Sequence, residues 1–202
     1  MVFRRKRIHE GSGRMEELSL FARVILGTLF LSTSVTKFRK KEEHVATVIN
    51  YRILPPSLAY PFARAEMATE LAAGILLCVG LFQQAAALLC ILLLAVYSCA
   101  IAINLVRGRR EVSCGCGGIA GNHTLSWWLV LRNFTLMIMG GWLFLYPSAW
   151  VSTDNLLRGE PFKLFYPRIF EVVIVSWLVV MMVIISNHLW ELSKRIKSFR
   201  RS

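Results

Sequence analysis

Five long apolar runs restrict the fold of this 202-residue chain more than any other feature. Each run approaches the roughly 20 residues that a helix needs to cross a bilayer. Residues of the hydrophobic class make up 55% of the chain, which is too many for a water-soluble domain with a polar surface. The sequence therefore predicts an all-α membrane protein, a four-helix transmembrane bundle with a fifth C-terminal transmembrane helix. The predicted crossings are residues 18–38, 61–82, 85–106, 126–146 and 169–188.

Charge and turn residues divide the chain around these runs. The net charge is +12, and the basic residues flank the apolar runs, so anionic lipid headgroups are a simpler partner than nucleic acid. Residues 42–54 have the pattern of a short helix in the membrane interface, stopped by Pro55 and Pro56. The predicted divisions are a basic tail at 1–17, a membrane domain at 18–146 with a loop at 107–125, a polar loop at 147–168, and the fifth helix with its basic tail at 169–202.

A Cys-Gly-Cys-Gly-Gly segment at 114–118 carries the most distinctive chemistry of the chain. Glycine lets the backbone bend, so Cys114 and Cys116 can turn both sulfurs the same way. A disulfide closed across a single residue departs from relaxed geometry, and strained disulfides are labile and oxidising. We interpret Cys114 and Cys116 as a thiol–disulfide exchange pair.

Basic residues surround this pair. Three arginines precede it and favour the thiolate, which is the reactive form, while a histidine after it is a candidate proton donor. Two thiolates could instead hold Cu(I), but zinc would need two further donors, and we predict no metal site. Lipid modification and a purely structural disulfide are further alternatives. The supporting residues are Arg107, Arg109, Arg110 and His123.

Polar side chains within the apolar runs gather in the half of the bilayer beneath the cysteine loop. Such residues are costly in lipid and often functional. Glu66 and Glu70 are four residues apart and share a helix face, and Arg132 is the predicted partner of Glu70. This pair is interpreted either as a structural contact or as a polar floor that moves protons or orients a substrate. The full set is Lys37, Glu66, Glu70, Asn104, Arg132 and Asn133.

The side of the membrane that carries the cysteine loop is left open by two opposed arguments. With five crossings, the loop side has 14 Lys and Arg residues against 8 on the other side, which favours the cytoplasm. Disulfide chemistry favours the outside, where thiols are not kept reduced. If the fifth run does not span, the count becomes 9 against 13 and also favours the outside.

Motifs lie in order across residues 23–133, and together they resemble the MauE family of methylamine-utilisation membrane proteins, a branch of the wider DoxX-like group. Gly117 stands where that family more usually has an aromatic residue. The motifs are Arg23, Gly27, Lys37, Tyr-Arg-Ile-Leu-Pro at 51–55, Glu-Leu-Ala-Ala-Gly at 70–74, Asn-Leu-Val-Arg-Gly-Arg at 104–109, the 114–118 segment, and Arg132-Asn133.

The resemblance implies a multi-pass protein of the bacterial cytoplasmic membrane with a DoxX-like four-helix core and an extracytoplasmic cysteine loop. It also implies a part in maturing the disulfide-rich small subunit of methylamine dehydrogenase, together with a thioredoxin-like redox partner. From the residues and the resemblance, we expect a protein that assists redox maturation of an exported, disulfide-containing substrate.

The enzymatic form of this hypothesis is a thiol–disulfide oxidoreductase. A quinone in the membrane is a conceivable electron acceptor, because the polar pocket is expected to open beside lipid. The alternatives are a non-catalytic membrane scaffold or transporter, and a Cu(I)-handling membrane protein.

Overall fold

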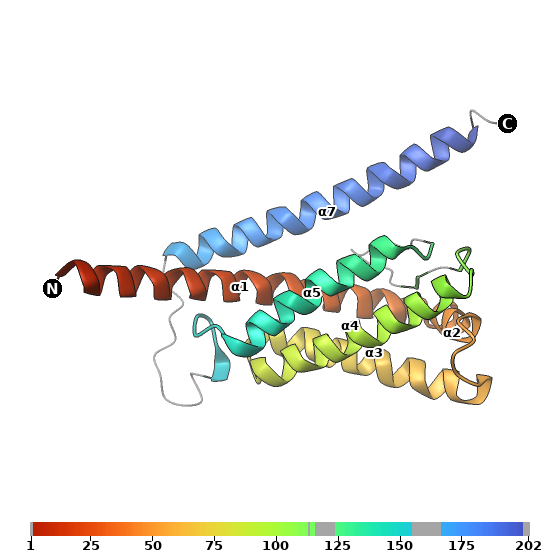
Figure 1. Cartoon of the computed structure of the whole chain (residues 1–202), viewed down its shortest axis with the longest axis horizontal. Helices are drawn as coiled ribbons and strands as arrows, with labels where there is room; N and C mark the ends of the chain where they lie inside the picture. The colour runs from red at the N-terminus through yellow and green to blue at the C-terminus, as the bar shows by residue number, and fades with distance from the viewer. Residues whose placement is uncertain (1, 113, 116–123, 155–166, 200–202) are drawn as a thin grey trace.

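The computed structural model describes residues 2–112, 114–115, 124–154 and 167–199, and in these ranges the fold is all-helical, without strands. Pro56 occupies the first turn of α3, where its missing N–H costs no hydrogen bond. Gly80 ends the same helix in the left-handed conformation, with φ +74°. The elements are α1 (Val2–Arg39), α2 (Lys41–Asn50), α3 (Pro56–Val79), α4 (Gln83–Val106), α5 (Trp127–Leu145) and α7 (Pro167–Phe199) (Figure 1).

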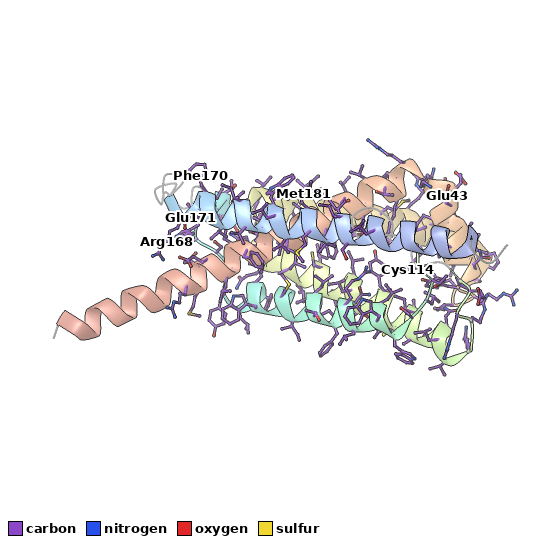
Figure 2. The ribbon with its side chains drawn as sticks, turned by 90° about the horizontal axis from the view of Figure 1, so that it is seen from above. Glu43, Cys114, Arg168, Phe170, Glu171 and Met181 are labelled. Atoms are coloured by element: carbon purple, nitrogen blue, oxygen red, sulfur yellow. The ribbon has the colours of Figure 1, made fainter. Side chains whose placement is uncertain are left out.

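Helices α1, α3, α4 and α5 pack side by side as an antiparallel bundle (Figure 1). Helix α2 lies at the end of the bundle where α1 and α4 finish and where α3 and α5 begin, and we call this the α2 end. Helix α7 contacts α1 outside the bundle. Cys114 and Glu43 lie at the α2 end, whereas Arg168 lies at the opposite end (Figure 2).

Four described helices are long and apolar enough to cross a membrane. They are Gly13–Arg39, Gln83–Val106, Trp127–Leu145 and Arg168–Ser186, which agree with four of the five predicted runs. The run predicted at 61–82 lies in α3, whose Arg64, Glu66 and Glu70 keep it out of this set. A crossing by α3 therefore stays a prediction. Helix α1 begins at Val2, so helical structure extends through the predicted basic tail.

Small residues let neighbouring helices approach closely. A Cβ atom on Gly74 of α3 would lie 2.9 Å from the backbone nitrogen of Leu31 in α1. A Cβ atom on Gly140 of α5 would lie 2.9 Å from Cγ1 of Ile91 in α4. Close backbone approach at small residues is how helices gain packing energy in lipid, where the hydrophobic effect does not drive association.

The end of the bundle opposite α2 is fixed by buried polar contacts. Arg23 is 2% exposed and donates hydrogen bonds to the carbonyl oxygens of Trp150 and Val151, both at 3.1 Å. Gln83 donates from Nε2 to the carbonyl of Ser148 at 2.9 Å and accepts from its backbone N–H at 3.1 Å. These contacts hold the segment after α5 against α1 and the first residue of α4.

Candidate functional site

Helix α2 holds the described part of the cysteine segment against the bundle. The Tyr51 hydroxyl, just after α2, donates a hydrogen bond to the carbonyl oxygen of Cys114 at 3.1 Å. Burial raises the pKa of Tyr51, so the phenol stays protonated as a donor. Gly115 has φ +68°, and a Cβ there would come within 2.8 Å of Cγ2 of Thr47. The backbone at Cys114 is therefore seated closely on α2.

Cys114 is a buried, disulfide-bonded residue at this seat. The other described cysteines, Cys78, Cys90 and Cys99, are free thiols. Cys116 and His123 lie outside the described residues, so their predicted roles stay predictions.

A buried ion cluster lies beside Cys114, centred on Lys37 of α1. The Lys37 ammonium is 2.6 Å from Oε1 of Glu66 and 2.8 Å from Oε2 of Glu70. The side chains of all three residues are at most 5% exposed. One cation thus contacts two carboxylates on consecutive turns of α3. The two carboxylates share one helix face, as their four-residue spacing predicted.

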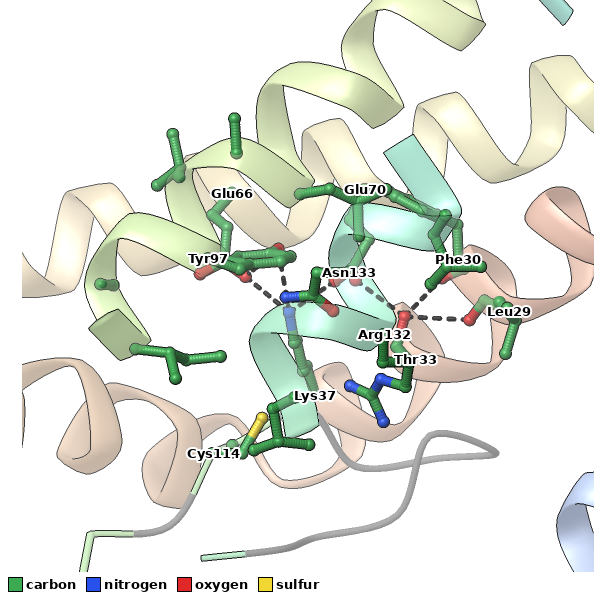
Figure 3. A pocket seen from close by; sticks show the side chains of 18 of the residues that line it. Leu29, Phe30, Thr33, Lys37, Glu66, Glu70, Tyr97, Cys114, Arg132 and Asn133 are labelled. Carbon is green, nitrogen blue, oxygen red and sulfur yellow. Dashed lines mark hydrogen bonds and ion pairs between the residues drawn. The ribbon is translucent and has the colours of Figure 1, made fainter. Parts of the chain in front are cut away.

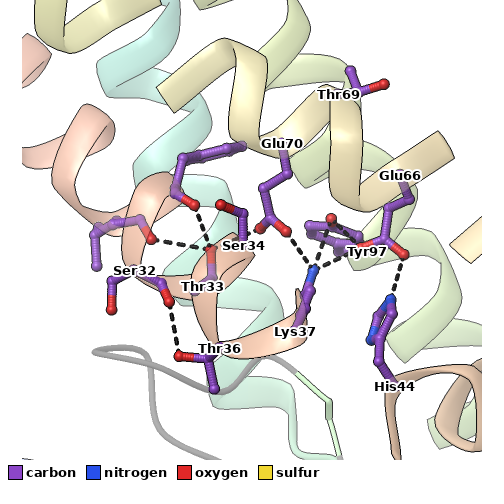
Figure 4. A network of polar contacts seen from close by, with 12 residues as sticks. Ser32, Thr33, Ser34, Thr36, Lys37, His44, Glu66, Thr69, Glu70 and Tyr97 are labelled. Carbon is purple, nitrogen blue, oxygen red and sulfur yellow. Dashed lines mark hydrogen bonds and ion pairs between the residues drawn. The ribbon is translucent and has the colours of Figure 1, made fainter. Parts of the chain in front are cut away.

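Three more side chains complete this cluster (Figure 4). The Tyr97 hydroxyl of α4 lies 2.6 Å from Oε1 of Glu66 and accepts from Lys37 at 3.1 Å. His44 Nε2 of α2 is 2.7 Å from Oε2 of Glu66, and the Thr33 hydroxyl is 2.7 Å from Oε1 of Glu70. We call Thr33, Lys37, His44, Glu66, Glu70 and Tyr97 the Lys37 cluster.

The Lys37 cluster has more carboxyl groups than cations. One ammonium is shared between the carboxyl groups of Glu66 and Glu70. The Thr33 hydroxyl lies 2.7 Å from Oε1 of Glu70 and within 3.1 Å of two backbone carbonyl oxygens of α1, so its single O–H can donate to only one of the three.

A cavity of about 960 Å³ joins Cys114 to the Lys37 cluster. Its polar end is lined by Lys37, Glu66, Glu70, Cys114, Arg132 and Asn133 (Figure 3). His44 lines the same end. Its remaining lining is mostly apolar and comes mainly from α1, α4, α5 and α7, with a smaller part from α2, the turn after α2, and α3. The cavity is thus polar next to the cysteine segment and apolar along the length of the bundle.

The predicted ion pair between Glu70 and Arg132 is wrong. Glu70 instead contacts Lys37 and Thr33, because the end of α1 packs directly against the face of α3 that carries the carboxylates. Arg132 and Asn133 do line the same cavity from α5. Depth along each helix located these side chains correctly, whereas it could not select which helix would face α3.

Two of the three loop arginines donate side-chain hydrogen bonds to described residues. Arg109 donates to Oδ1 of Asn104 at 3.1 Å and to the carbonyl of Tyr51 at 3.4 Å. Arg107 donates to the carbonyl of Arg52 at 3.2 Å. Arg110 is exposed. These contacts tie the end of α4 to the turn after α2, and the predicted effect of the arginines on the thiols stays a prediction.

His44, Tyr97, Thr33 and Tyr51 were not predicted as site residues. His44 lies in α2 and Tyr51 directly follows that helix, seven residues later, and this spacing of about two helical turns was the available signal. The apolar face at Val45 and Val48 instead led to the prediction of a helix in the membrane interface. Tyr97 and Thr33 are single polar groups in apolar helices, and only the packing shows which of them meets the carboxylates.

Comparison with protein-family models identifies the family of the chain. The family model described as "Methylamine utilisation protein MauE" matches residues 15–146. The chain belongs to the MauE family. The match includes α1 from residue 15 onward, all of α3, α4 and α5, and the whole Lys37 cluster, whereas α7 lies beyond it. With four apolar helices long enough to span, this MauE-family member is a multi-pass membrane protein.

Curated relatives carry the same family name. "Methylamine utilization protein MauE" of Paracoccus denitrificans is 36% identical over 114 residues, covering 56% of this chain and 61% of the relative. The protein of that name from Methylorubrum extorquens is 36% identical over 133 residues, covering 65% and 72%. The chain thus spans about three fifths of the length of the Paracoccus relative. No solved structure matches this member of the MauE family.

Proposed function

We propose that this protein assists thiol–disulfide redox maturation of an exported protein at the bacterial cytoplasmic membrane. Cys114 and Cys116 are the exchanging pair in this proposal. The observation that carries it is a disulfide-bonded Cys114 in the lining of a cavity that also contains a buried ion cluster. Since the other described cysteines are free thiols, Cys116 is the partner that we propose for Cys114.

The exchange moves two electrons in a balanced step. A dithiol on the incoming protein attacks the Cys114–Cys116 disulfide through a mixed disulfide. The bond between the two loop sulfurs breaks, a disulfide forms in the partner, and both loop cysteines become thiols. A thioredoxin-like protein is the proposed partner, since such proteins present a reactive dithiol.

The family name directs the proposal toward a methylamine dehydrogenase-type substrate. The relatives are named for methylamine utilisation, and we extend this role to the present chain as part of the proposal. An extracytoplasmic cysteine loop follows from the same role, because an exported substrate forms its disulfides outside the cytoplasm. Helix α3 crosses the membrane in this arrangement, with Glu66 and Glu70 turned into the bundle and both paired with Lys37.

A single-turnover reaction tests the exchange directly. Purified full-length protein in detergent is mixed with reduced thioredoxin as the probe, and alkylation followed by mass measurement counts the thiols on each protein. We expect one thioredoxin dithiol to be oxidised for each chain, with two new thiols on the chain. The Cys114→Ser/Cys116→Ser variant should lose the reaction, and the control Cys78→Ser/Cys99→Ser should retain it. Equal reaction in both variants would favour the non-catalytic scaffold.

A further inference from the structure

In the described part of the chain, the cavity lining includes two buried neutral side chains that each have an atom without a hydrogen-bond partner. Nδ1 of His44 and Nδ2 of Asn133 are both unsatisfied, and their side chains are 8% and 2% exposed. A buried donor or acceptor without a partner is costly and calls for an explanation. The two residues come from α2 and α5 and line the same cavity as Cys114. Both atoms therefore indicate a polar ligand at this end.

The hydrogen-bonding needs of these atoms describe that ligand. The Asn133 amide N–H is a donor and requires an acceptor such as a carbonyl oxygen. His44 donates from Nε2 to Glu66 at 2.7 Å, so in its neutral form Nδ1 is an acceptor and requires a hydroxyl. A ring that carries a carbonyl when oxidised and a hydroxyl when reduced satisfies each atom in one of its two states.

The charges favour a neutral head group over a phosphate. The ammonium of Lys37 has three donors, and these face Glu66, Glu70 and Tyr97. No donor of Lys37 is left for an anion, and the two carboxylates beside it repel one. Arg132 lines the same end of the cavity, but the open positions at His44 and Asn133 are neutral groups.

The apolar part of the cavity fits a long hydrocarbon tail. On α1 its lining recurs every four residues, at Phe21, Ile25, Leu29, Thr33 and Lys37. Sixteen residues of helix correspond to about 24 Å, most of the roughly 30 Å of hydrocarbon in a bilayer. Helix α7 contributes Val179, Val180 and Val183 to the same cavity. The groove therefore runs within membrane-spanning helices, where a ligand can enter from lipid.

We propose that this cavity binds a membrane quinone, with its ring between His44 and Asn133 and its tail along α1. The proposal rests on the exchange function above and names its electron acceptor. In the step, two S–H bonds of the reduced Cys114–Cys116 pair break and their S–S bond forms. The two electrons and two protons pass to the quinone, where two O–H bonds form. Quinol leaves into the bilayer, and the loop disulfide is restored.

Quinone binding is measured apart from thiol chemistry. Full-length Cys114→Ser protein in nanodiscs is titrated with decylubiquinone, and quenching of tryptophan fluorescence is followed, since Trp128 lines the cavity. We expect saturable binding of one quinone per chain. Asn133→Leu and the isosteric Asn133→Asp both remove the donor and should weaken binding about tenfold, the effect of one lost hydrogen bond. Thr135→Leu, on an exposed position of α5, is the matched control and should bind normally.

The outcomes separate the quinone site from the exchange function. Non-saturable quenching, or an equal Kd in the Asn133 variants and the control, overturns the quinone site even if thioredoxin is oxidised normally. Normal quinone binding without thioredoxin oxidation overturns the exchange function and leaves the site standing. Purified wild-type protein that retains phospholipid, and from which decylubiquinone displaces none, also overturns the proposal in favour of a lipid site.

Discussion

Removing the buried ammonium of Lys37 should destabilise the protein far more than removing the exposed ammonium of Lys40. Lys37 is 5% exposed, and its partners Glu66 and Glu70 are 4% and 3% exposed in their side chains. Lys37→Met leaves two buried carboxylates without their shared cation. Loss of one partner of a buried ion pair costs about 3–5 kcal/mol, and we expect the free energy of unfolding to fall by this amount.

Adding Glu70→Gln to Lys37→Met tests whether the lost stability comes from an unpaired Glu70 carboxylate. Without Lys37, Glu66 keeps Tyr97 and His44, whereas Glu70 keeps only Thr33 among its described partners. Glu70 is therefore the more poorly compensated charge. Adding Glu70→Gln to Lys37→Met should recover about 1–3 kcal/mol, within the usual range of coupling between contacting residues.

Lys40→Met is the matched control. Lys40 pairs with Glu43 at 3.0 Å, but these side chains are 61% and 69% exposed, so the change should cost about 0–1 kcal/mol. The assay is reversible unfolding of the full-length protein in detergent micelles, followed by circular dichroism. The reasoning is refuted if Lys37→Met costs no more than Lys40→Met, or if adding Glu70→Gln makes Lys37→Met less stable.

Further predictions concern the cysteine seat, the far end of the bundle and the orientation. Gly115→Ala should lower the rate of thioredoxin oxidation more than Gly108→Ala; both positions have positive φ, but only the first has a neighbour, Thr47, within 4 Å, and equal rates would contradict this. Tyr51→Phe should cost about 0.5–1.5 kcal/mol in the unfolding assay. Because burial raises the pKa of Tyr51, its contribution should be constant below about pH 10 and fade above it, so an equal difference between wild type and Tyr51→Phe at pH 8 and pH 11 would argue against the contact. Arg23→Met should lower the melting temperature without changing thioredoxin oxidation; a lost exchange reaction in folded protein would contradict a purely structural part. Membrane-impermeant maleimide should label reduced Cys114 and Cys116 in intact cells, and labelling only after permeabilisation would place the loop in the cytoplasm.

Most of the fold could be predicted from the length of the apolar runs and from the depth of polar residues within them. Run length predicted α1, α4, α5 and α7 within a few residues at most ends, because a span in lipid must be continuous and apolar. Depth along each helix placed Lys37, Glu66 and Glu70 in the same half of the bilayer, and in the structure they are in contact. Pairing by charge alone failed for Arg132, since opposite charges at equal depth do not show which helices are neighbours.

The residues that complete the site could not be predicted in the same way. His44 belongs to a short helix that folds back at the α2 end, and its burial depends on how the turn at Lys40 directs that helix. Tyr51 reaches Cys114 across 63 positions of sequence, a contact that arises only from packing. Local patterns record which side of a helix is apolar, but they do not record what the polar side will meet.

Trapping of a mixed disulfide tests the central claim most directly. Full-length Cys116→Ser and Cys114→Ser proteins in native membranes are each mixed with oxidised thioredoxin, whose disulfide the remaining thiol attacks, then quenched with an alkylating agent and separated without reductant. We expect a reductant-sensitive adduct of one thioredoxin per chain with at least one single variant, and none with the Cys114→Ser/Cys116→Ser variant. Absence of any adduct from both single variants, with the remaining sulfur always recovered as an unreacted thiol, would contradict thiol–disulfide exchange at this site.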